Sequence, residues 1–301
     1  MQTSWGDLTL SDAHVHFFSH RFFETLKAAV DNQSRDRKGA VAAASVEQLG
    51  WDLPSEDPAA LARRWCEELD RHGVAHAALI ASTPGDEASV LAAAAACPGR
   101  FFTYAMVNPA AENAAVADGL NGICLFPAMH RYSLHDPRAE RIIAQAATKR
   151  CVVFVHCGVL TVGVRKKLGL PSPFDMRFSN PLDLHALALW FPETRFVVPH
   201  FGAGMLREAL MLADLCPNVY LDTSSSNSWM RYEGLDLATV FRRALDILGP
   251  SRLLFGSDSS FFPRGWHRAI FDAQAKVLGD MNLDSRSARQ IFGENLRSLF
   301  S

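Results

Sequence analysis

Short apolar runs alternate with longer amphipathic stretches along the whole chain. Several runs, such as CVVFVH and RFVVPH, are apolar almost throughout, which indicates burial on both faces and therefore parallel strands covered by helices. We expect eight strands, at Leu8–His14, Val74–Ala81, Phe101–Val107, Gly122–Phe126, Cys151–His156, Arg195–His200, Val219–Asp222 and Leu253–Ser257.

Apolar residues at three- and four-residue spacing fill the gaps between the strands and predict helices. The stretch DPAALARRWCEELDRHG, for example, starts with Asp-Pro and ends in glycine, which are start and stop signals of a helix. Further helices are predicted at residues 86–97, 136–150, 181–191, 205–216, 235–249, 267–279 and 285–300. This order favours an α/β fold, a closed (β/α)8 TIM barrel. An open doubly wound sheet is the alternative, but no GxGxxG motif follows the first strand.

The connection after the first strand is unusually long. About forty residues separate His16 from the helix that starts near Asp57, and connections of this length are usually functional. We therefore expect an extended loop or helical insertion at residues 17–56 that acts as a lid. No low-complexity segment divides the chain, so a single domain is expected over residues 1–301.

Composition narrows the choice of partner. The chain has 30 basic and 32 acidic side chains and a net charge of −2, which argues against nucleic acid and favours a small molecule. No apolar run approaches the ~20 residues needed to cross a membrane, and the N-terminus lacks the pattern of a secretory signal. We expect a cytoplasmic protein. The six cysteines form no CxxC pair and are expected to be free thiols.

Five polar side chains fall at the carboxyl ends of predicted strands. His14 and His16 are two residues apart and therefore point the same way, His156 and His200 each end a strand, and Asp258 follows the eighth. The carboxyl ends of barrel strands carry the active sites of such enzymes. A lone histidine at a strand end is usually a satisfied hydrogen-bonding group, but five such groups together suit Zn²⁺ or a similar divalent ion.

The motifs DAHVH, VVFVHCG, VVPHFG, PNVYLDTS, LLFGSD and IFGENLRSLF resemble, in matching order, the amidohydrolase superfamily. The similarity is to its amidohydrolase-related branch, which also contains aminocarboxymuconate-semialdehyde decarboxylase and several lactonases. The resemblance implies that His14, His16, His156 and Asp258 are metal ligands. It also implies that His200 polarises the substrate or stabilises negative charge, and that Asp258 takes the proton of the attacking water.

One position departs from the family pattern. Binuclear members have a lysine on the fourth strand that bridges two metals, whereas this chain reads GICLFP, with Cys124 at that position. A single metal ion is therefore expected, most simply Zn²⁺, with Mn²⁺, Fe²⁺ or Co²⁺ as alternatives. Branch members are commonly dimers, which makes a homodimer one alternative and leaves the oligomeric state open.

The resemblance and the ligand set together imply metal-dependent hydrolysis of an ester, lactone or amide. Non-oxidative decarboxylation of a carboxylated substrate is the alternative and would need a cation clamp, for which Arg177 is the preferred candidate beside the Arg165–Lys167 cluster. Trp229, in the motif NSWMRY after the seventh strand, is expected to contact substrate. A barrel that only binds a ligand is the third possibility, although every ligand position is filled.

Overall fold

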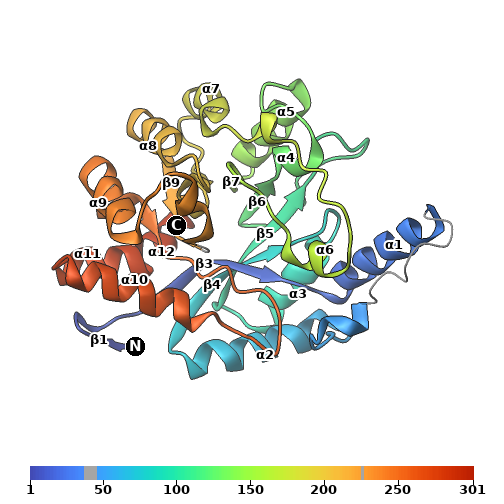
Figure 1. Cartoon of the computed structure of the whole chain (residues 1–301), viewed down its shortest axis with the longest axis horizontal. Helices are drawn as coiled ribbons and strands as arrows, with labels where there is room; N and C mark the ends of the chain where they lie inside the picture. Colours follow the sequence, from blue (N-terminus) through green and yellow to red (C-terminus); the bar gives the residue numbers. More distant parts are fainter. Residues whose placement is uncertain (37–45, 225–226) are drawn as a thin grey trace.

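The computed structural model describes residues 1–36, 46–224 and 227–301. Eight parallel strands lie side by side in the order β10-β9-β8-β7-β6-β5-β4-β3, with helices around them (Figure 1). The strands are β3 (Leu10–Phe17), β4 (Val74–Ala81), β5 (Phe101–Val107), β6 (Gly122–Leu125), β7 (Val152–Val155), β8 (Phe196–Val198), β9 (Val219–Asp222) and β10 (Leu253–Leu254). A short antiparallel pair, β1 (Gln2–Thr3) and β2 (Gly6–Asp7), precedes them.

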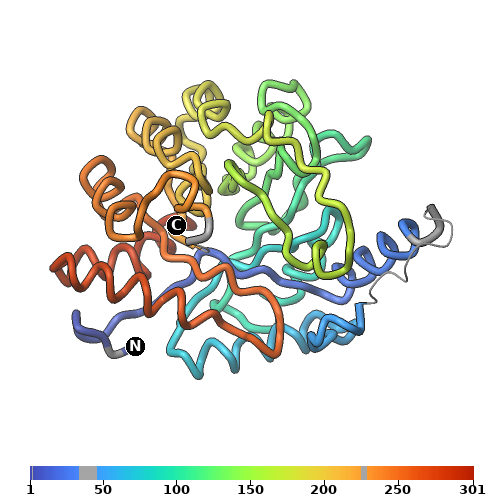
Figure 2. Tube along the Cα trace, in the orientation of Figure 1, coloured from blue at the N-terminus to red at the C-terminus, as the bar shows by residue number. Residues whose placement is uncertain are grey.

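The two edges of this sheet meet and close the barrel. Val15 of β3 forms a parallel bridge with Ser259, and the Ala13 amide donates to the Phe255 carbonyl at 2.8 Å. The His16 amide likewise donates to the Ser259 carbonyl at 2.7 Å. The first and last parts of the chain therefore run next to each other, as the blue and orange-red tubes of Figure 2 show. The predicted TIM barrel is confirmed.

Three predicted strands have a boundary that is wrong by two residues or more. The strand expected at Arg195–His200 ends at Val198, which places His200 in the 3₁₀ helix η4 (His200–Gly202). The first strand runs from Leu10 to Phe17 instead of from Leu8 to His14, so that His14 and His16 both lie in its carboxyl-terminal half. The eighth was expected at Leu253–Ser257 but ends at Leu254. Asp258 adopts a left-handed backbone with φ of 57°, which an extended strand does not accommodate. The chain therefore turns where it meets β3.

The predicted helices all have counterparts, although two are divided. Residues 181–191 form the 3₁₀ helix η3 (Pro181–Leu184) and α7 (His185–Trp190), and residues 285–300 form α11 (Ser285–Arg289), the π-helical η7 (Gln290–Glu294) and α12 (Asn295–Leu299). The side chains of Asp57, Asp136 and Asp236 cap α2, α5 and α9.

The remaining helices are α1 (His20–Asp36), α2 (Pro58–Arg71), α3 (Glu87–Ala96), α4 (Pro127–His130), α5 (Pro137–Thr148), α6 (Gly163–Lys167), α8 (Leu206–Leu215), α9 (Leu237–Leu248) and α10 (Arg268–Asp280). The remaining 3₁₀ helices are η1 (Val46–Leu49), η2 (Met176–Phe178), η4 (His200–Gly202), η5 (Asn227–Tyr232) and η6 (Pro250–Arg252). Within the described ranges no helix is both long enough and apolar enough to cross a membrane.

Side chains that alternate along the strands separate two apolar layers. One face packs between the strands and the surrounding helices, as Leu79, Ile123 and Val153 do. The other face fills the barrel interior, where Tyr104 and Phe154 are almost completely buried. These apolar side chains fill the barrel below the polar residues of the barrel mouth.

The stretch after β3 contains α1 and η1, and residues 37–45 lie outside the described part of the chain. Phe22, Phe23, Leu26 and Val30 of α1 pack in one apolar cluster with residues of α6 and the segment after it. The helix thus lies against the loop that follows β7.

Gly256 is placed where a side chain has no room. A Cβ there would lie 2.5 Å from Asp222 Oδ1 and 2.8 Å from the Ser224 Cβ. We expect Gly256→Ala to lower the free energy of unfolding by about 1–3 kcal/mol through overpacking, measured by urea denaturation. Gly279→Ala is the control, since its Cβ meets nothing closer than 3.9 Å on a helix where alanine is favoured. Equal loss in both variants would contradict this account.

Candidate metal centre

Barrel closure brings His14, His16 and Asp258 together. The two histidines share one face of β3, and the amide of Asp258 donates to the His14 carbonyl at 3.0 Å. Asp258 Oδ1 lies 3.2 Å from His16 Nε2 and 3.7 Å from His14 Nε2. One ligand atom from each of the three residues falls within 4.8 Å of the others, a spacing that suits a shared cation.

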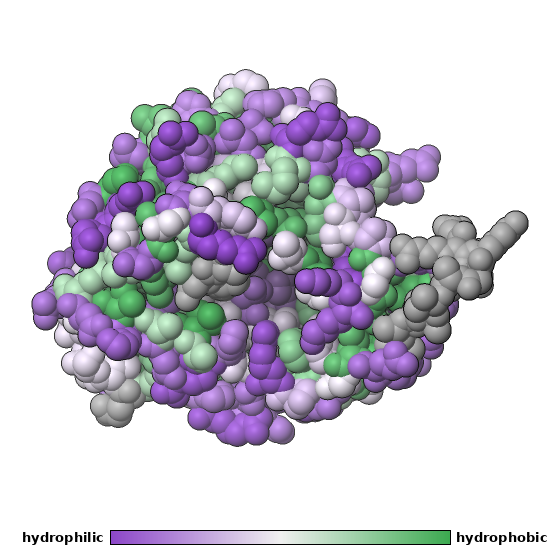
Figure 3. Space-filling view, in the orientation of Figure 1, coloured by the Kyte–Doolittle hydropathy of each residue, from purple (hydrophilic) through white to green (hydrophobic). Residues whose placement is uncertain are grey.

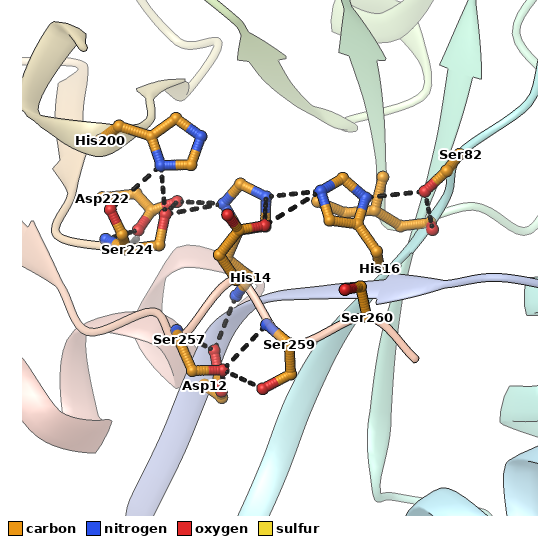
Figure 4. Close-up of polar contacts among 12 residues, drawn as sticks. Asp12, His14, His16, Ser82, His200, Asp222, Ser224, Ser257, Ser259 and Ser260 are labelled. Carbon is orange, nitrogen blue, oxygen red and sulfur yellow. Dashed lines mark hydrogen bonds and ion pairs between the residues drawn. The ribbon is translucent and has the colours of Figure 1, made fainter. Parts of the chain in front are cut away.

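The second nitrogen of each imidazole is held by a separate partner (Figure 4). His14 Nδ1 donates to Asp222 Oδ2 at 2.6 Å. His16 Nδ1 lies 2.7 Å from Ser82 Oγ, whose own proton goes to the carbonyl of Ile80. Each ring therefore carries a proton on Nδ1, and the two Nε2 atoms face each other 3.3 Å apart.

This donor set fits a divalent metal ion. Two facing imidazole lone pairs repel each other unless a proton or a metal ion lies between them, and the oxygen of Asp258 offers a third ligand atom to a metal ion there. Burial lowers the pKa of His16, which keeps its ring in the neutral form that binds metal. Burial alone would raise the pKa of Asp258, but the hydrogen bond with His16 and the neighbouring His14 bring it below its ordinary value. The carboxylate is therefore ionised.

His156 and His200 extend the row of imidazoles. The His200 ring centroid lies 5.0 Å from that of His14 and 5.3 Å from that of His156. His156 stacks on Phe126, and its buried Nδ1 has no hydrogen-bond partner among the described residues. Burial, together with the neighbouring histidines, lowers the pKa of His156 well below its usual value. His156 lies outside the tight group of three but has a nitrogen to offer a ligand.

The prediction missed Asp222 and Ser224. Ser224 Oγ lies 2.9 Å from Asp222 Oδ2, from His14 Nδ1 and from His200 Nδ1, and the His200 ring also contacts the Ser224 carbonyl at 3.0 Å. Asp222 is fully buried at the end of β9. The motif PNVYLDTS carries this polar strand end, but its partners come from other strands.

Asp12 is a further missed residue and lies below the metal centre. Its carboxylate accepts from the amides of His14 and Ser257 and from Trp266 Nε1, at 2.9, 3.0 and 2.7 Å. Burial raises the pKa of Asp12 to about 6, against the effect of these donors. Asp12 thereby ties β3 to the loop that carries Asp258.

A cavity of about 500 Å³ opens above these residues, and His14, His16, His156, His200 and Asp258 all line it. Phe126, Met129 and Leu160 form apolar parts of its wall. Figure 3 shows the hollow, with hydrophilic residues deep inside it and hydrophobic ones on part of its rim.

Of the two residues predicted to contact substrate, Trp229 lines the cavity and Arg177 does not. Trp229 is buried and lines the cavity. Arg177 does not line it: its side chain is 83% exposed and forms an ion pair with Asp175 at 2.6 Å. The guanidinium of Arg177 therefore lies on the surface, paired with a carboxylate two residues before it in the same loop. The cations that do line the cavity are Lys167, Arg231 and Arg264.

Comparison with known families agrees with this geometry. The amidohydrolase family model matches residues 11–301. The chain belongs to the amidohydrolase family. It is therefore an enzyme of the amidohydrolase type, as predicted. Among curated proteins, a stretch covering 34% of this amidohydrolase is 35% identical over 105 residues to protein fluG of Emericella nidulans, and it covers only 12% of that protein.

Solved structures share the fold at low identity. An amidohydrolase from Burkholderia multivorans with bound zinc is 15% identical, with a TM-score of 0.62 over 98% of this chain and 99% of that one. A 5-carboxyvanillate decarboxylase from Novosphingobium aromaticivorans, complexed with manganese and a nitrobenzoic acid, is 13% identical, with a TM-score of 0.65 over 100% and 99%. A proposed 2-pyrone-4,6-dicarboxylic acid hydrolase from Pseudomonas putida is 16% identical, with a TM-score of 0.58 over 98% of each chain.

The hydrogen bond between Asp222 and His14 generates a prediction about metal affinity. In Asp222→Asn an amide group can face Nδ1 and shift the ring proton to Nε2, which blocks the nitrogen that faces His16. We expect the affinity for Zn²⁺ to fall about 10- to 100-fold, measured by equilibrium dialysis. Asp214→Asn, an exposed residue of α8, is the control. Unchanged affinity in Asp222→Asn would show that the carboxylate does not orient the ligand.

Proposed function

We propose that this amidohydrolase is a metal-dependent hydrolase of a small ester, lactone or amide. The observation that carries the proposal is the group formed by His14, His16 and Asp258, whose ligand atoms face one another at the bottom of the cavity. His156 is proposed as the remaining protein ligand, because its buried Nδ1 lacks any other described partner.

A divalent cation held there would polarise a carbonyl group and lower the pKa of water to about 7. Zn²⁺ suits three imidazoles and one carboxylate, with Mn²⁺, Fe²⁺ and Co²⁺ as alternatives. One ion is proposed, because Cys124 is buried in the apolar barrel interior and burial raises its thiol pKa well above the ordinary value.

Asp258 and His200 would handle the protons. Asp258 is ionised and can accept a proton from the attacking water. His200 Nδ1 faces the carbonyl oxygen of Ser224, which can only accept, so the neutral ring presents an unprotonated Nε2. The unprotonated Nε2 of His200 could accept the proton from Asp258, which would return the aspartate to its ionised form. The imidazolium so formed would stabilise a developing negative charge.

The segment after β3 is proposed to cover the substrate, within a single domain of residues 1–301. Phe18, Phe22 and Trp51 from this segment line the cavity, and α1 packs against the loop after β7. Such a cover would exclude bulk water and strengthen the electrostatic interactions inside. The cytoplasmic location and the homodimer stay predictions from the sequence.

Decarboxylation is the second candidate. Three cations and one carboxylate line the cavity in the described part of the chain, and a carboxylated substrate would be attracted to that excess of positive charge. Release of carbon dioxide from an aromatic acid without any hydrolysis of esters or lactones would favour this reaction.

His156 tests the ligand set. We expect His156→Ala to bind well below one equivalent of metal, since the site loses one of its nitrogen donors, as measured by elemental analysis after dialysis. Cys124→Ser is the matched buried control and should keep the metal content of the wild type. Full metal content in His156→Ala would remove His156 from the set of ligands.

Asp258 tests the reaction. The metal-loaded enzyme should hydrolyse members of a panel of aryl esters, lactones and amides, and Asp258→Asn should lower kcat roughly 100- to 10,000-fold without unfolding the protein. Circular dichroism monitors the fold. Wild-type kcat in Asp258→Asn would rule out its role as the proton acceptor, and absence of hydrolysis across the panel would favour the lyase.

A further inference from the structure

The cavity is positively charged although the chain is not. Among the described residues, its lining contains the cations Lys167, Arg231 and Arg264 but one carboxylate, Asp258, which leaves an excess of two positive charges before any metal ion binds. The whole chain has a net charge of −2. A concentration of positive charge in a walled pocket attracts anions, so the pocket is built for an acidic ligand.

Two of these cations share one aromatic pair. The rings of Trp51 and Phe261 stack with centroids 4.0 Å apart and an interplanar angle of 12°. Lys167 Nζ lies 5.5 Å from the Trp51 centroid and 5.9 Å from that of Phe261, and Arg264 Cζ lies 4.6 Å from Phe261. We call these four residues the cationic wall. They come from three separate segments and meet only in the folded chain.

Within the described residues, neither cation of the wall forms an ion pair with a carboxylate. In the parts of the chain that the structure describes, no carboxylate lies within 4.0 Å of Lys167 or Arg264. Other surface cations do have such partners, for example Arg138 with Asp136 and Arg268 with Asp272. Arg264 donates instead to the carbonyl of Asp258 and to Ser260 Oγ, at 3.2 and 2.9 Å. These contacts fix the guanidinium at the edge of the metal centre.

On the side of Lys167 and Trp51, the wall is separated from the metal centre by one aromatic ring, whereas Arg264 reaches the backbone of Asp258. Phe18 lies between them, with its centroid 5.6 Å from His16 and 6.0 Å from Trp51. A group bound by Lys167 beside Trp51 therefore cannot also lie among His14, His16 and Asp258. The charged group and the reacting group must be different parts of one substrate.

Building on the proposed function, we propose that the substrate carries a carboxylate that does not react. The carboxylate binds Lys167 on the cationic wall and is attracted by the charge of Arg264, while the reacting group faces the metal centre. The body between them is apolar, because Phe126 and Met129 line the cavity beside the metal centre. The carboxylate is retained in the product, and the wall selects acids over their neutral analogues.

A matched pair of ligands tests the proposal. 4-Hydroxybenzoate and its methyl ester differ only in charge, and their binding to the metal-loaded protein can be followed through the fluorescence of Trp51 and Trp229, which line the cavity. We expect the acid to bind at least about tenfold more tightly, and Lys167→Gln and Arg264→Gln each to remove most of that preference. Added salt should weaken the binding of the acid but not the binding of the ester.

The controls are chosen to isolate the wall. Lys166→Gln removes the same charge from the adjacent, exposed position of α6, and Arg268→Gln removes an arginine charge outside the cavity. Both should keep the wild-type preference. Arg264 contacts the Asp258 carbonyl, so Arg264→Gln could also disturb the metal centre. If that variant loses metal, the test of the wall depends on Lys167→Gln alone. Equal binding of acid and ester, an equal loss in Lys166→Gln, or displacement of the acid by inorganic phosphate at the same concentration would overturn the proposal.

Hydrolysis provides a separate readout. With 4-acetoxybenzoate and its methyl ester as substrates, Lys167→Gln should raise KM for the acid about tenfold and leave kcat within twofold. If the acid binds with the expected dependence on Lys167 but no ester is hydrolysed, the proposed hydrolase function is wrong and the carboxylate-binding role of the wall is supported. If the esters are hydrolysed equally well in every variant, the hydrolase function is supported and the carboxylate-binding role of the wall is wrong.

Discussion

The seam between β3 and the segment after β10 is the constraint on which the site depends. Parallel barrel strands place their carboxyl ends at one rim, but only the pairing of Val15 with Ser259 sets Asp258 beside the two histidines of β3. The amide of Asp258 donates to the carbonyl of His14, so backbone hydrogen bonds fix the separation of the candidate ligands. The left-handed backbone at Asp258 turns its carboxylate into the cavity instead of along the strand. Closure of the barrel and assembly of the centre are thus one event.

A second layer of carboxylates holds the seam and the ligands in place. Asp12 accepts from both sides of the seam, and Asp222 accepts from His14 across the barrel. Buried carboxylates are costly unless they are saturated with donors, and both are. Because Gly256 leaves no room for a side chain near Asp222 and His14, the seam can approach this layer closely. The site therefore owes its geometry to residues that do not face the cavity.

Much of this arrangement could be predicted from the sequence, because strand alternation is a local property. His14 and His16 follow from the two-residue period, and His156, His200 and Asp258 follow from the ends of apolar runs. The roles of Asp222 and Ser224 could not be predicted, since their partners are brought near only by closure. Arg177 and Lys167 occupy the same loop region, and only the path of the folded loop turns one outward and the other toward the cavity. The end of β10 was misjudged because an apolar run gives no sign of a left-handed residue beyond it.

The floor and the rim of the cavity differ in charge: neutral imidazoles lie at the floor and cations lie at the rim. At the floor, burial lowers the pKa of His156 and His200, which leaves neutral nitrogens available to bind or accept protons. At the rim, Lys167 and Arg264 rest on aromatic faces, which stabilise a cation without neutralising it as a carboxylate would. A carboxylate partner at either position would cancel the charge that attracts a ligand, and a bare cation deep in the cavity would repel a bound metal ion. Charge at the mouth and neutral donors at the floor therefore allow a cation site and an anion site to coexist one aromatic ring apart.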